Sequence, residues 1–181
     1  MGKKIVLLTG SPRRGGNTAA MADGFEKRAK ELGHEVVRFD TAFMKIGGCH
    51  ACETCYKTGK PCSFDDDFNR IAVQTETADA VVFVMPVYWY TMPAQIKAVL
   101  DRFFCFMVAQ KPIAGKKTAL ISCCEEEDMT VLDGVKIPFE RSVALMQWEV
   151  FGEVLVPGVY AKGDIDRTDG VARAAALAEK L

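Results

Sequence analysis

The sequence predicts an α/β protein with a doubly wound parallel sheet of five strands. Short apolar runs rich in β-branched residues alternate along the 181-residue chain with segments whose apolar residues recur at helical spacing. Continuous apolar runs suit strands that are buried on both faces of a parallel sheet. Alternating strands and helices with short connections are typical of doubly wound folds. Because we find no linker, we expect one domain, residues 1–181, with a cysteine-rich insertion at about 45–64.

The N-terminal half contributes two strands and two helices to this prediction. The run Lys4–Thr9 is the first strand, and apolar residues at helical spacing from Met21 onward indicate a helix that Gly33 ends. The second strand is Glu35–Asp40, and a weaker helical pattern covers Asp65–Thr77.

The C-terminal half supplies the other three strands. These are Ala80–Met85, Lys117–Cys123 and Val150–Val156. The helix after the first of them has Pro93 in its first turn, where proline is tolerated. Its predicted packing stripe consists of Ile96, Val99, Leu100, Phe103 and Phe104.

Two further helical regions complete the expected fold. The region before the last strand contains Gly134 and Pro138, which we expect to interrupt the helix. The alanine-rich segment Arg167–Leu181 is predicted to be a final amphipathic helix.

Two loops follow the first and third strands, and together they predict one ligand pocket. Gly10–Thr18 opens a helix, so its backbone N–H groups and hydroxyls can bind a phosphate. Pro86–Gln95 contains Tyr88, Trp89 and Tyr90, which offer flat apolar surface to a ring. Both loops belong at the carboxyl ends of parallel strands, where such sheets bind ligands. The predicted ligand is a phosphate joined to a planar heterocycle.

The composition of the Gly10–Thr18 loop favours a terminal monophosphate. The loop lacks the Lys-Ser/Thr ending of a triphosphate-binding loop, and its spacing does not match the dinucleotide fingerprint G-x-G-x-x-G. A charge-assisted contact to the phosphate can come from Arg13 or Arg14.

The segments SPRRGGNT and PVYWYTMPAQIKAVLDR resemble the flavodoxin-like NAD(P)H-dependent FMN reductases, and the resemblance covers almost the whole chain. It implies a flavodoxin-like fold and bound FMN, with hydride passing from NADH or NADPH to the flavin and then to a small-molecule acceptor. Because the flavin does this chemistry, we name no catalytic side chain. The cofactor-binding residues that the resemblance implies are Ser11, Arg13, Asn17, Thr18, Pro86, Val87, Tyr88, Trp89 and Met92.

Four of the seven cysteines crowd into one segment with the spacing C-x2-C-x2-C-x6-C. Thiolates at this spacing can ligate an iron–sulfur cluster or zinc. The segment is similar to the cluster motif of the iron–sulfur flavoproteins, a branch of the same family, which implies [4Fe–4S] ligands at Cys49, Cys52, Cys55 and Cys62. The alternative is reduced or disulfide-linked thiols in a simple flavin reductase, which Gly158–Asp164 resembles more closely, and we adopt it as the working expectation.

Charge and hydropathy narrow the classes of function. The chain has 23 basic and 24 acidic residues, so a net charge of −1 offers no broad attraction to nucleic acid. No apolar run approaches the length of a membrane span, and we expect a cytoplasmic protein. Surplus aromatic surface on the second loop predicts a homodimer, as the resemblance also implies. An FMN-dependent oxidoreductase, an iron–sulfur electron carrier and a flavin-binding sensor are the functions that remain.

Overall fold

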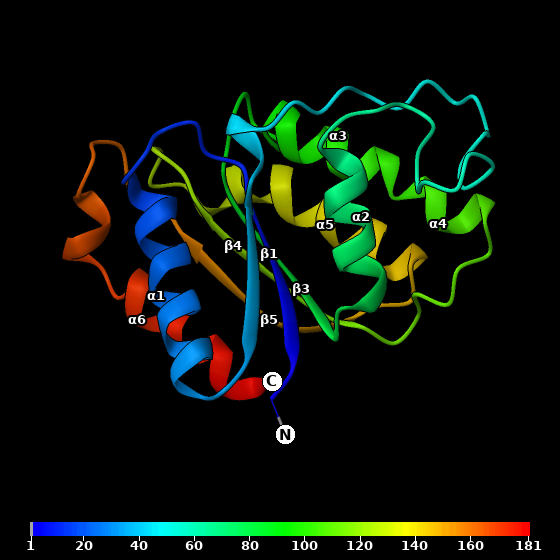
Figure 1. The fold of residues 1–181 in the computed structure, drawn as a ribbon. Helices are drawn as coiled ribbons and strands as arrows, with labels where there is room; N and C mark the ends of the chain where they lie inside the picture. Colours follow the sequence, from blue (N-terminus) through cyan, green and yellow to red (C-terminus); the bar gives the residue numbers. More distant parts are fainter. Residues whose placement is uncertain (1) are drawn as a thin grey trace.

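The computed structural model describes residues 2–181, which form a central sheet with a layer of helices on each face (Figure 1). The strands are β1 (Lys4–Thr9), β2 (Glu35–Asp40), β3 (Ala80–Pro86), β4 (Lys117–Cys123) and β5 (Glu149–Val156). Each neighbouring pair in these residues is parallel, in the order β2-β1-β3-β4-β5. This is the strand order of flavodoxin-like folds. The predicted doubly wound sheet of five parallel strands is confirmed.

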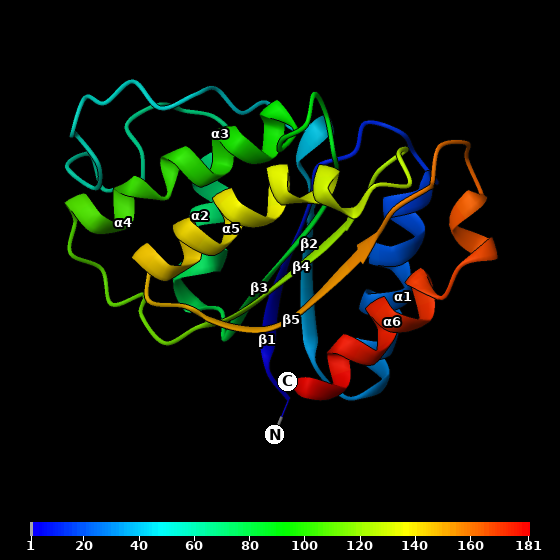
Figure 2. The ribbon, with the colours of Figure 1, turned by 180° about the vertical axis from the view of Figure 1, so that it is seen from behind.

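The helices divide between the two faces of the sheet (Figures 1 and 2). On one face lie α1 (Asn17–Glu31) and α6 (Gly170–Leu177). On the other face lie α2 (Phe68–Thr77), α3 (Ala94–Arg102), α4 (Phe104–Val108) and α5 (Asp133–Leu145). Short 3-10 turns cover Thr41–Phe43, Met129–Leu132, Asp164–Arg167 and Ala178–Lys180.

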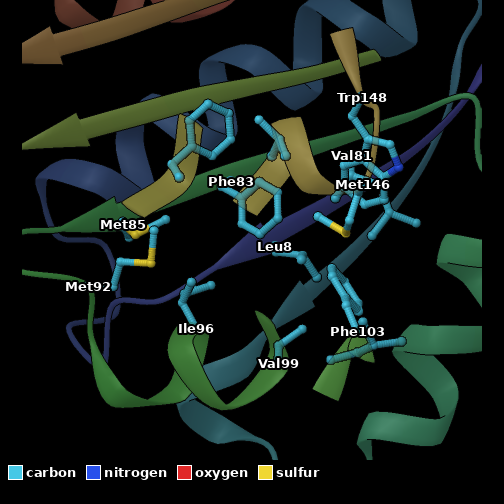
Figure 3. Close-up of a cluster of buried hydrophobic side chains, with 14 of the residues drawn as sticks. Leu8, Val81, Phe83, Met85, Met92, Ile96, Val99, Phe103, Met146 and Trp148 are labelled. Carbon is cyan, nitrogen blue, oxygen red and sulfur yellow. The ribbon is translucent and has the colours of Figure 1, made fainter. Parts of the chain in front are cut away.

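The core consists of two apolar clusters, one on each face of the sheet. Side chains alternate along a strand, so Val6 and Leu8 face one cluster while Ile5 and Leu7 face the other. In the first cluster, Phe83, Phe103 and Trp148 bring the sheet and its covering helices together (Figure 3). Burial on both faces explains why the strand sequences are continuously apolar.

Two helix predictions need correction. The expected stripe stops at the buried Phe103: α3 ends at Arg102, and Phe104, the first residue of α4, is 41% exposed. Pro138 lies inside α5 without interrupting it. The carbonyl of Gly134, which would otherwise accept from residue 138, accepts a hydrogen bond from the Thr91 hydroxyl at 3.1 Å.

The last helix also begins later than predicted. Arg167 is the final residue of a 3-10 turn, and α6 starts only at Gly170. A Cβ at Gly170 would lie 2.7 Å from Ile165, so glycine permits the close approach of the turn to the helix start.

The segment 44–67 contains neither helix nor strand and passes over the ends of α3 and α4 (Figure 1). Its two ends are bonded to each other, and its middle is bonded to α2. Asp67 bonds the backbone N–H of Lys45 at 2.8 Å, and the Tyr56 hydroxyl donates to Glu76 at 2.8 Å. Burial and the Glu76 carboxylate raise the pKa of Tyr56, so its hydroxyl stays a donor.

Candidate functional site

A cavity of about 480 Å³ opens at the carboxyl ends of the strands. We call it the main cavity. Its position is the ligand-binding edge that parallel α/β sheets share, and its volume suits a small molecule or cofactor. Its walls are formed by Ser11, Arg13, Gly16, Asn17, Thr18, Pro86, Val87, Tyr88, Trp89, Tyr90, Cys123, Cys124, Glu125, Glu126, Val159 and Tyr160.

One end of the main cavity is the N-terminus of α1. The preceding loop folds back on itself, because the N–H of Gly16 donates to the carbonyl of Arg13 at 3.1 Å and Gly15 has a positive φ of 62°. Gly16 is the N-cap residue, and no side chain among residues 2–181 caps this helix end. The first N–H groups of a 15-residue helix are therefore available to an anion.

Two neighbouring arginines in this loop have different surroundings. Arg13 lines the main cavity and pairs with no carboxylate in the described part of the chain. Arg14 does not line this cavity, because its guanidinium stacks on the ring of Phe43, 3.8 Å from the centroid. Of the two arginines that the sequence offered, the structure brings Arg13 to the cavity.

Asn17 lies at the cavity, but its amide is already engaged. It donates to the carbonyl of Ala161 at 2.9 Å and accepts from the N–H groups of Gly163 and Ile165 at 3.0 and 3.4 Å. These bonds hold the segment 159–165 against α1. Asn17 thus positions the wall formed by Val159 and Tyr160, rather than presenting its whole amide to a ligand.

Another part of the cavity wall comes from a tight turn, Tyr88–Thr91, which we call the aromatic turn. Tyr88 and Thr91 exchange two backbone hydrogen bonds of 2.9 and 3.0 Å. Between them, Trp89 and Tyr90 have φ values of 47° and 58°, which non-glycine residues rarely adopt. Two consecutive strained residues are the kind of feature that functional sites retain. The turn leaves Trp89 94% exposed.

Met92 does not lie where the sequence expectation placed it. It is buried in the core next to Met85 (Figure 3) and does not contribute to the wall of the main cavity. The tight aromatic turn reverses the chain at Thr91, so the next side chain packs beneath the turn. The other eight expected cofactor-binding residues all line the cavity.

The third wall follows β4 and includes residues outside the expected cofactor-binding set. Cys123 and Cys124 line the cavity, and burial raises the pKa of Cys123 to about 12 and also raises that of Cys124, so both are neutral thiols near neutral pH. Val159 was missed because it comes after β5. Its N–H donates to the carbonyl of Cys124 at 2.8 Å, which draws this segment to the cavity.

A second, smaller hollow lies under the 44–67 segment, and we call it the cysteine hollow. Cys49, Cys52, Cys55 and Cys62 all line it, together with His50, Ala51, Glu53, Phe64, Arg102, Phe104 and Cys105. The sequence motif therefore brings its four thiols to one place. In this conformation no three His, Cys, Asp or Glu side chains of residues 2–181 are arranged to hold a single metal ion.

Left-handed residues explain how successive cysteines reach the same hollow. Ala51, Glu53 and Tyr56 have φ values of 51°, 52° and 60°. They fall between or directly after the first three cysteines, where each reverses the local direction of the chain. Three strained residues in one short loop are costly, and such strain is concentrated at functional sites.

The donor set of the cysteine hollow fits an iron–sulfur cluster in type and number, since four thiolates are its usual ligands. Each thiolate binds a different iron of a cubane, so the four sulfur atoms need not converge on one ion. The hollow encloses about 10 Å³; Cys49 and Cys52 are exposed, Cys55 is half-buried and Cys62 is buried.

The sheet order and the main cavity define a flavodoxin-like α/β protein with a cavity at its switch point. Residues 3–132 match the family described as NADPH-dependent FMN reductase. The chain belongs to this family, a class of FMN-containing oxidoreductases.

Curated relatives carry the name "Iron-sulfur flavoprotein". One from Archaeoglobus fulgidus is 36% identical over 99 residues, which are 55% of this chain and 44% of the relative. One from Methanosarcina thermophila is 36% identical over 102 residues, 55% of this chain and 51% of the relative. The chain thus matches about half the length of each.

Solved structures extend the likeness to nearly the whole fold. An NAD(P)H:quinone oxidoreductase from Methanothermobacter marburgensis superposes with a TM-score of 0.72 at 19% identity, covering 98% of this chain and 95% of that one. An azoreductase from Bacillus anthracis superposes with a TM-score of 0.73 at 19% identity, covering 99% and 100%. At this identity the likeness concerns the fold alone.

None of the helices formed by residues 2–181 has the length and apolar character that a bilayer-spanning helix requires.

Proposed function

We propose that this protein is an FMN-dependent NAD(P)H oxidoreductase that binds the flavin in the main cavity and passes reducing equivalents to a small-molecule acceptor. One observation carries the proposal. The uncapped N-terminus of α1 and the aromatic turn both line one cavity of about 480 Å³ at the switch point of the sheet. An anion-binding end and a flat apolar end match the two parts of FMN.

The phosphate end is formed by Ser11, Arg13 and Thr18 with the first N–H groups of α1. A dianionic phosphate there is favoured by the helix dipole and by a guanidinium that has no carboxylate partner among residues 2–181. Asn17 holds the 159–165 wall in place. These side chains bind and orient the cofactor and take no part in proton transfer.

The ring end is formed by Pro86, Val87, Tyr88 and Trp89, beside Cys123 and Cys124. Bound FMN supplies a ring that accepts a hydride from a nicotinamide and returns electrons to an acceptor. The two buried thiols stay neutral there, so they add no negative charge beside the ring. The aromatic turn provides the shelf and the exposed opening through which a nicotinamide reaches it.

Flavin titration tests this assignment. Replacing the guanidinium in Arg13→Met should weaken FMN binding at least tenfold, because a charged hydrogen bond contributes about 1.5–3 kcal/mol. Binding of riboflavin, which lacks the phosphate, should be unchanged. Arg14→Met is the matched control, because that side chain stacks on Phe43 away from the cavity. Equal losses in both variants would place the phosphate elsewhere.

Steady-state assays of the FMN-loaded protein test the activity itself. Oxidation of NADH or NADPH should depend on an added quinone, nitro compound or free flavin. Tight FMN binding without NAD(P)H oxidation would instead favour a flavin-binding sensor.

A second candidate function is an iron–sulfur flavoprotein that passes electrons between FMN and a [4Fe–4S] cluster. The arrangement of Cys49, Cys52, Cys55 and Cys62 around one hollow favours it, and so do the relatives that carry this name. Anaerobically purified protein should then hold about four iron atoms per chain. Cys55→Ser should lose this iron, whereas Cys105→Ser, in the same hollow but outside the motif, should keep it.

A further inference from the structure

Arg102 is a buried guanidinium with unused donors. It is the last residue of α3 and is 3% exposed. Its Nη1 donates to Asp66 and, at 3.3 Å, to the carbonyl of Gly47, while its plane stacks over Phe68 at 4.3 Å. Among residues 2–181, its Nε and Nη2 have no hydrogen-bond partner. A charged group whose donors are buried without a partner is costly, so it requires an explanation.

The fold explains only part of this arrangement. A positive charge suits the C-terminal end of α3, and the ion pair with Asp66 fastens the 44–67 segment to the helix. Both needs are met by Nη1 and by the charge alone. Neither these roles nor the stacking on Phe68 uses the donors on Nε and Nη2.

The unused donors belong to a side chain that lines the cysteine hollow. Burial lowers the pKa of Arg102, but the Asp66 carboxylate and the neighbouring Cys62 sulfur outweigh burial, so the pKa is raised overall. Arg102 and Cys62 line the same hollow, which places the guanidinium beside one of the four motif thiols. Sulfur accepts stronger hydrogen bonds as a thiolate than as a thiol.

We propose that Arg102 is the counter-charge and N–H donor for the four-thiolate group formed by Cys49, Cys52, Cys55 and Cys62 when that group holds its metal. The proposal rests on the second candidate function. Four thiolates around a cluster leave a net negative charge, which grows when an electron is added. A buried positive charge and N–H bonds to sulfur favour the reduced state, because net charge and hydrogen bonds to sulfur set cluster potentials.

The other charged and titratable groups at the hollow do not replace Arg102. Glu53 lines the hollow and contributes negative charge, and Asp66 lies on the Nη1 side. His50 packs on Phe64, with 4.4 Å between ring centroids, in the exposed part of the loop. Arg102 is the one permanent cation among the side chains that line the hollow in residues 2–181.

The test measures the reduction potential of the cluster in the reconstituted protein. The titration is monitored through the EPR signal of the reduced cluster, so that the flavin does not interfere. Arg102→Met should shift the oxidised-to-reduced ratio at a fixed potential at least tenfold toward oxidised, which is about 59 mV for one electron. Arg102→Lys keeps the charge but not the planar donors, so it should recover part of this shift.

Asp66→Asn separates a direct effect from loop anchoring. It breaks the ion pair but keeps the guanidinium and removes a negative charge, so its potential should rise or stay unchanged. A downward shift equal to that of Arg102→Met, or no shift in Arg102→Met, would overturn the proposal. Flavin binding by each variant confirms that the fold is intact.

Cobalt(II) alone provides a test that does not need iron. Thiolate-to-cobalt absorbance measures binding of Co²⁺ to the metal-free thiols, and Arg102→Met should weaken it at least tenfold. If wild-type protein takes up no iron but binds Co²⁺ in an Arg102-dependent way, the electron-carrier function fails and the role of Arg102 stands. Cobalt binding of equal strength in the wild type and in Arg102→Met refutes the proposal.

Discussion

The hydroxyl of Thr91 donates a hydrogen bond of 3.1 Å to the carbonyl oxygen of Gly134, joining the aromatic turn to the first turn of α5. This bond uses the carbonyl that Pro138 leaves without an intrahelical donor. The proline that breaks the helical hydrogen-bond ladder therefore creates the acceptor that holds the turn. The aromatic turn forms the flat part of the wall of the main cavity.

Gly134→Ala should displace the aromatic turn. A Cβ at this position would lie 1.6 Å from the carbonyl oxygen of Tyr90, and the backbone cannot yield without moving the turn. Alanine is favoured over glycine inside a helix by about 1 kcal/mol, yet we expect a net loss of stability of about 1–3 kcal/mol from overpacking. FMN affinity should fall with it.

Thermal unfolding and flavin titration measure both effects of Gly134→Ala. Gly48→Ala is the matched control, because an added Cβ there meets no atom within 4 Å. If Gly134→Ala stabilises the protein and leaves FMN binding unchanged, the turn does not depend on this close approach.

Asn17 offers a way to separate wall stability from ligand binding. Asn17→Ala removes the bonds to Ala161, Gly163 and Ile165, so it should lower the free energy of unfolding by about 1–2 kcal/mol and weaken FMN binding moderately. Asn17→Asp keeps both acceptor interactions and suits a helix N-terminus. It should keep more of the stability but weaken FMN binding more, through repulsion of the phosphate.

Denaturant unfolding and FMN titration of the two Asn17 variants should therefore rank them in opposite orders. The same ranking in both measurements would mean that Asn17 affects cofactor binding only through the stability of the wall.

The sequence was sufficient to predict the sheet and most of the main cavity because these depend on local patterns. Runs such as Ile5–Leu8 are buried on both faces and read as strands wherever they occur. Pro138 was misjudged because its compensation comes from Thr91, 47 residues away. Met92 was misplaced because nothing in the sequence signals two consecutive left-handed residues before it.

The wall formed by Val159 and Tyr160 could be recognised only in the fold. These residues follow β5, and they reach the cavity through the contact of Val159 with Cys124 and through the amide of Asn17. The sequence offered one signal for this wall: the residues follow the carboxyl end of the last strand, and all parallel strands end at the same edge of the sheet. The unused donors of Arg102 had no sequence signal, since burial and partners decide them.

A carboxylate network near the main cavity predicts how stability depends on pH. Burial would raise the pKa of Asp40, but hydrogen bonds from Thr9 at 2.7 Å and Arg38 at 2.8 Å hold it below its ordinary value. A carboxyl group with a lowered folded pKa stabilises the fold above its unfolded pKa of about 4. That stability is lost as the pH falls from about 5 toward the folded pKa.

Asp40→Asn should therefore lower the melting temperature at pH 7 and make its fall between pH 5 and pH 3 shallower than in the wild type. Melting curves across this range provide the measurement. Asp65→Asn is the control, because that side chain is 88% exposed and pairs only with Lys60 at the surface. Parallel pH profiles for wild type and Asp40→Asn would show that other carboxylates dominate acid unfolding.

The exposed side chains at the mouth of the main cavity predict self-association. Trp89 is 94% exposed, and Tyr90 and Tyr160 are each 61% exposed. A cluster of large aromatic side chains in water favours a partner surface, and a second copy of the chain can cover it in a closed pair. Sedimentation at micromolar concentration should show a species of twice the 19.9 kDa mass of the chain.

Trp89→Ala should shift the dimer toward monomer without changing the melting temperature of the monomer, because this indole has almost no contact with the core. Leu145→Ser, exposed at the far end of α5, should leave the dimer intact. A wild-type protein that sediments only as a monomer would mean that the aromatic turn serves the cavity alone.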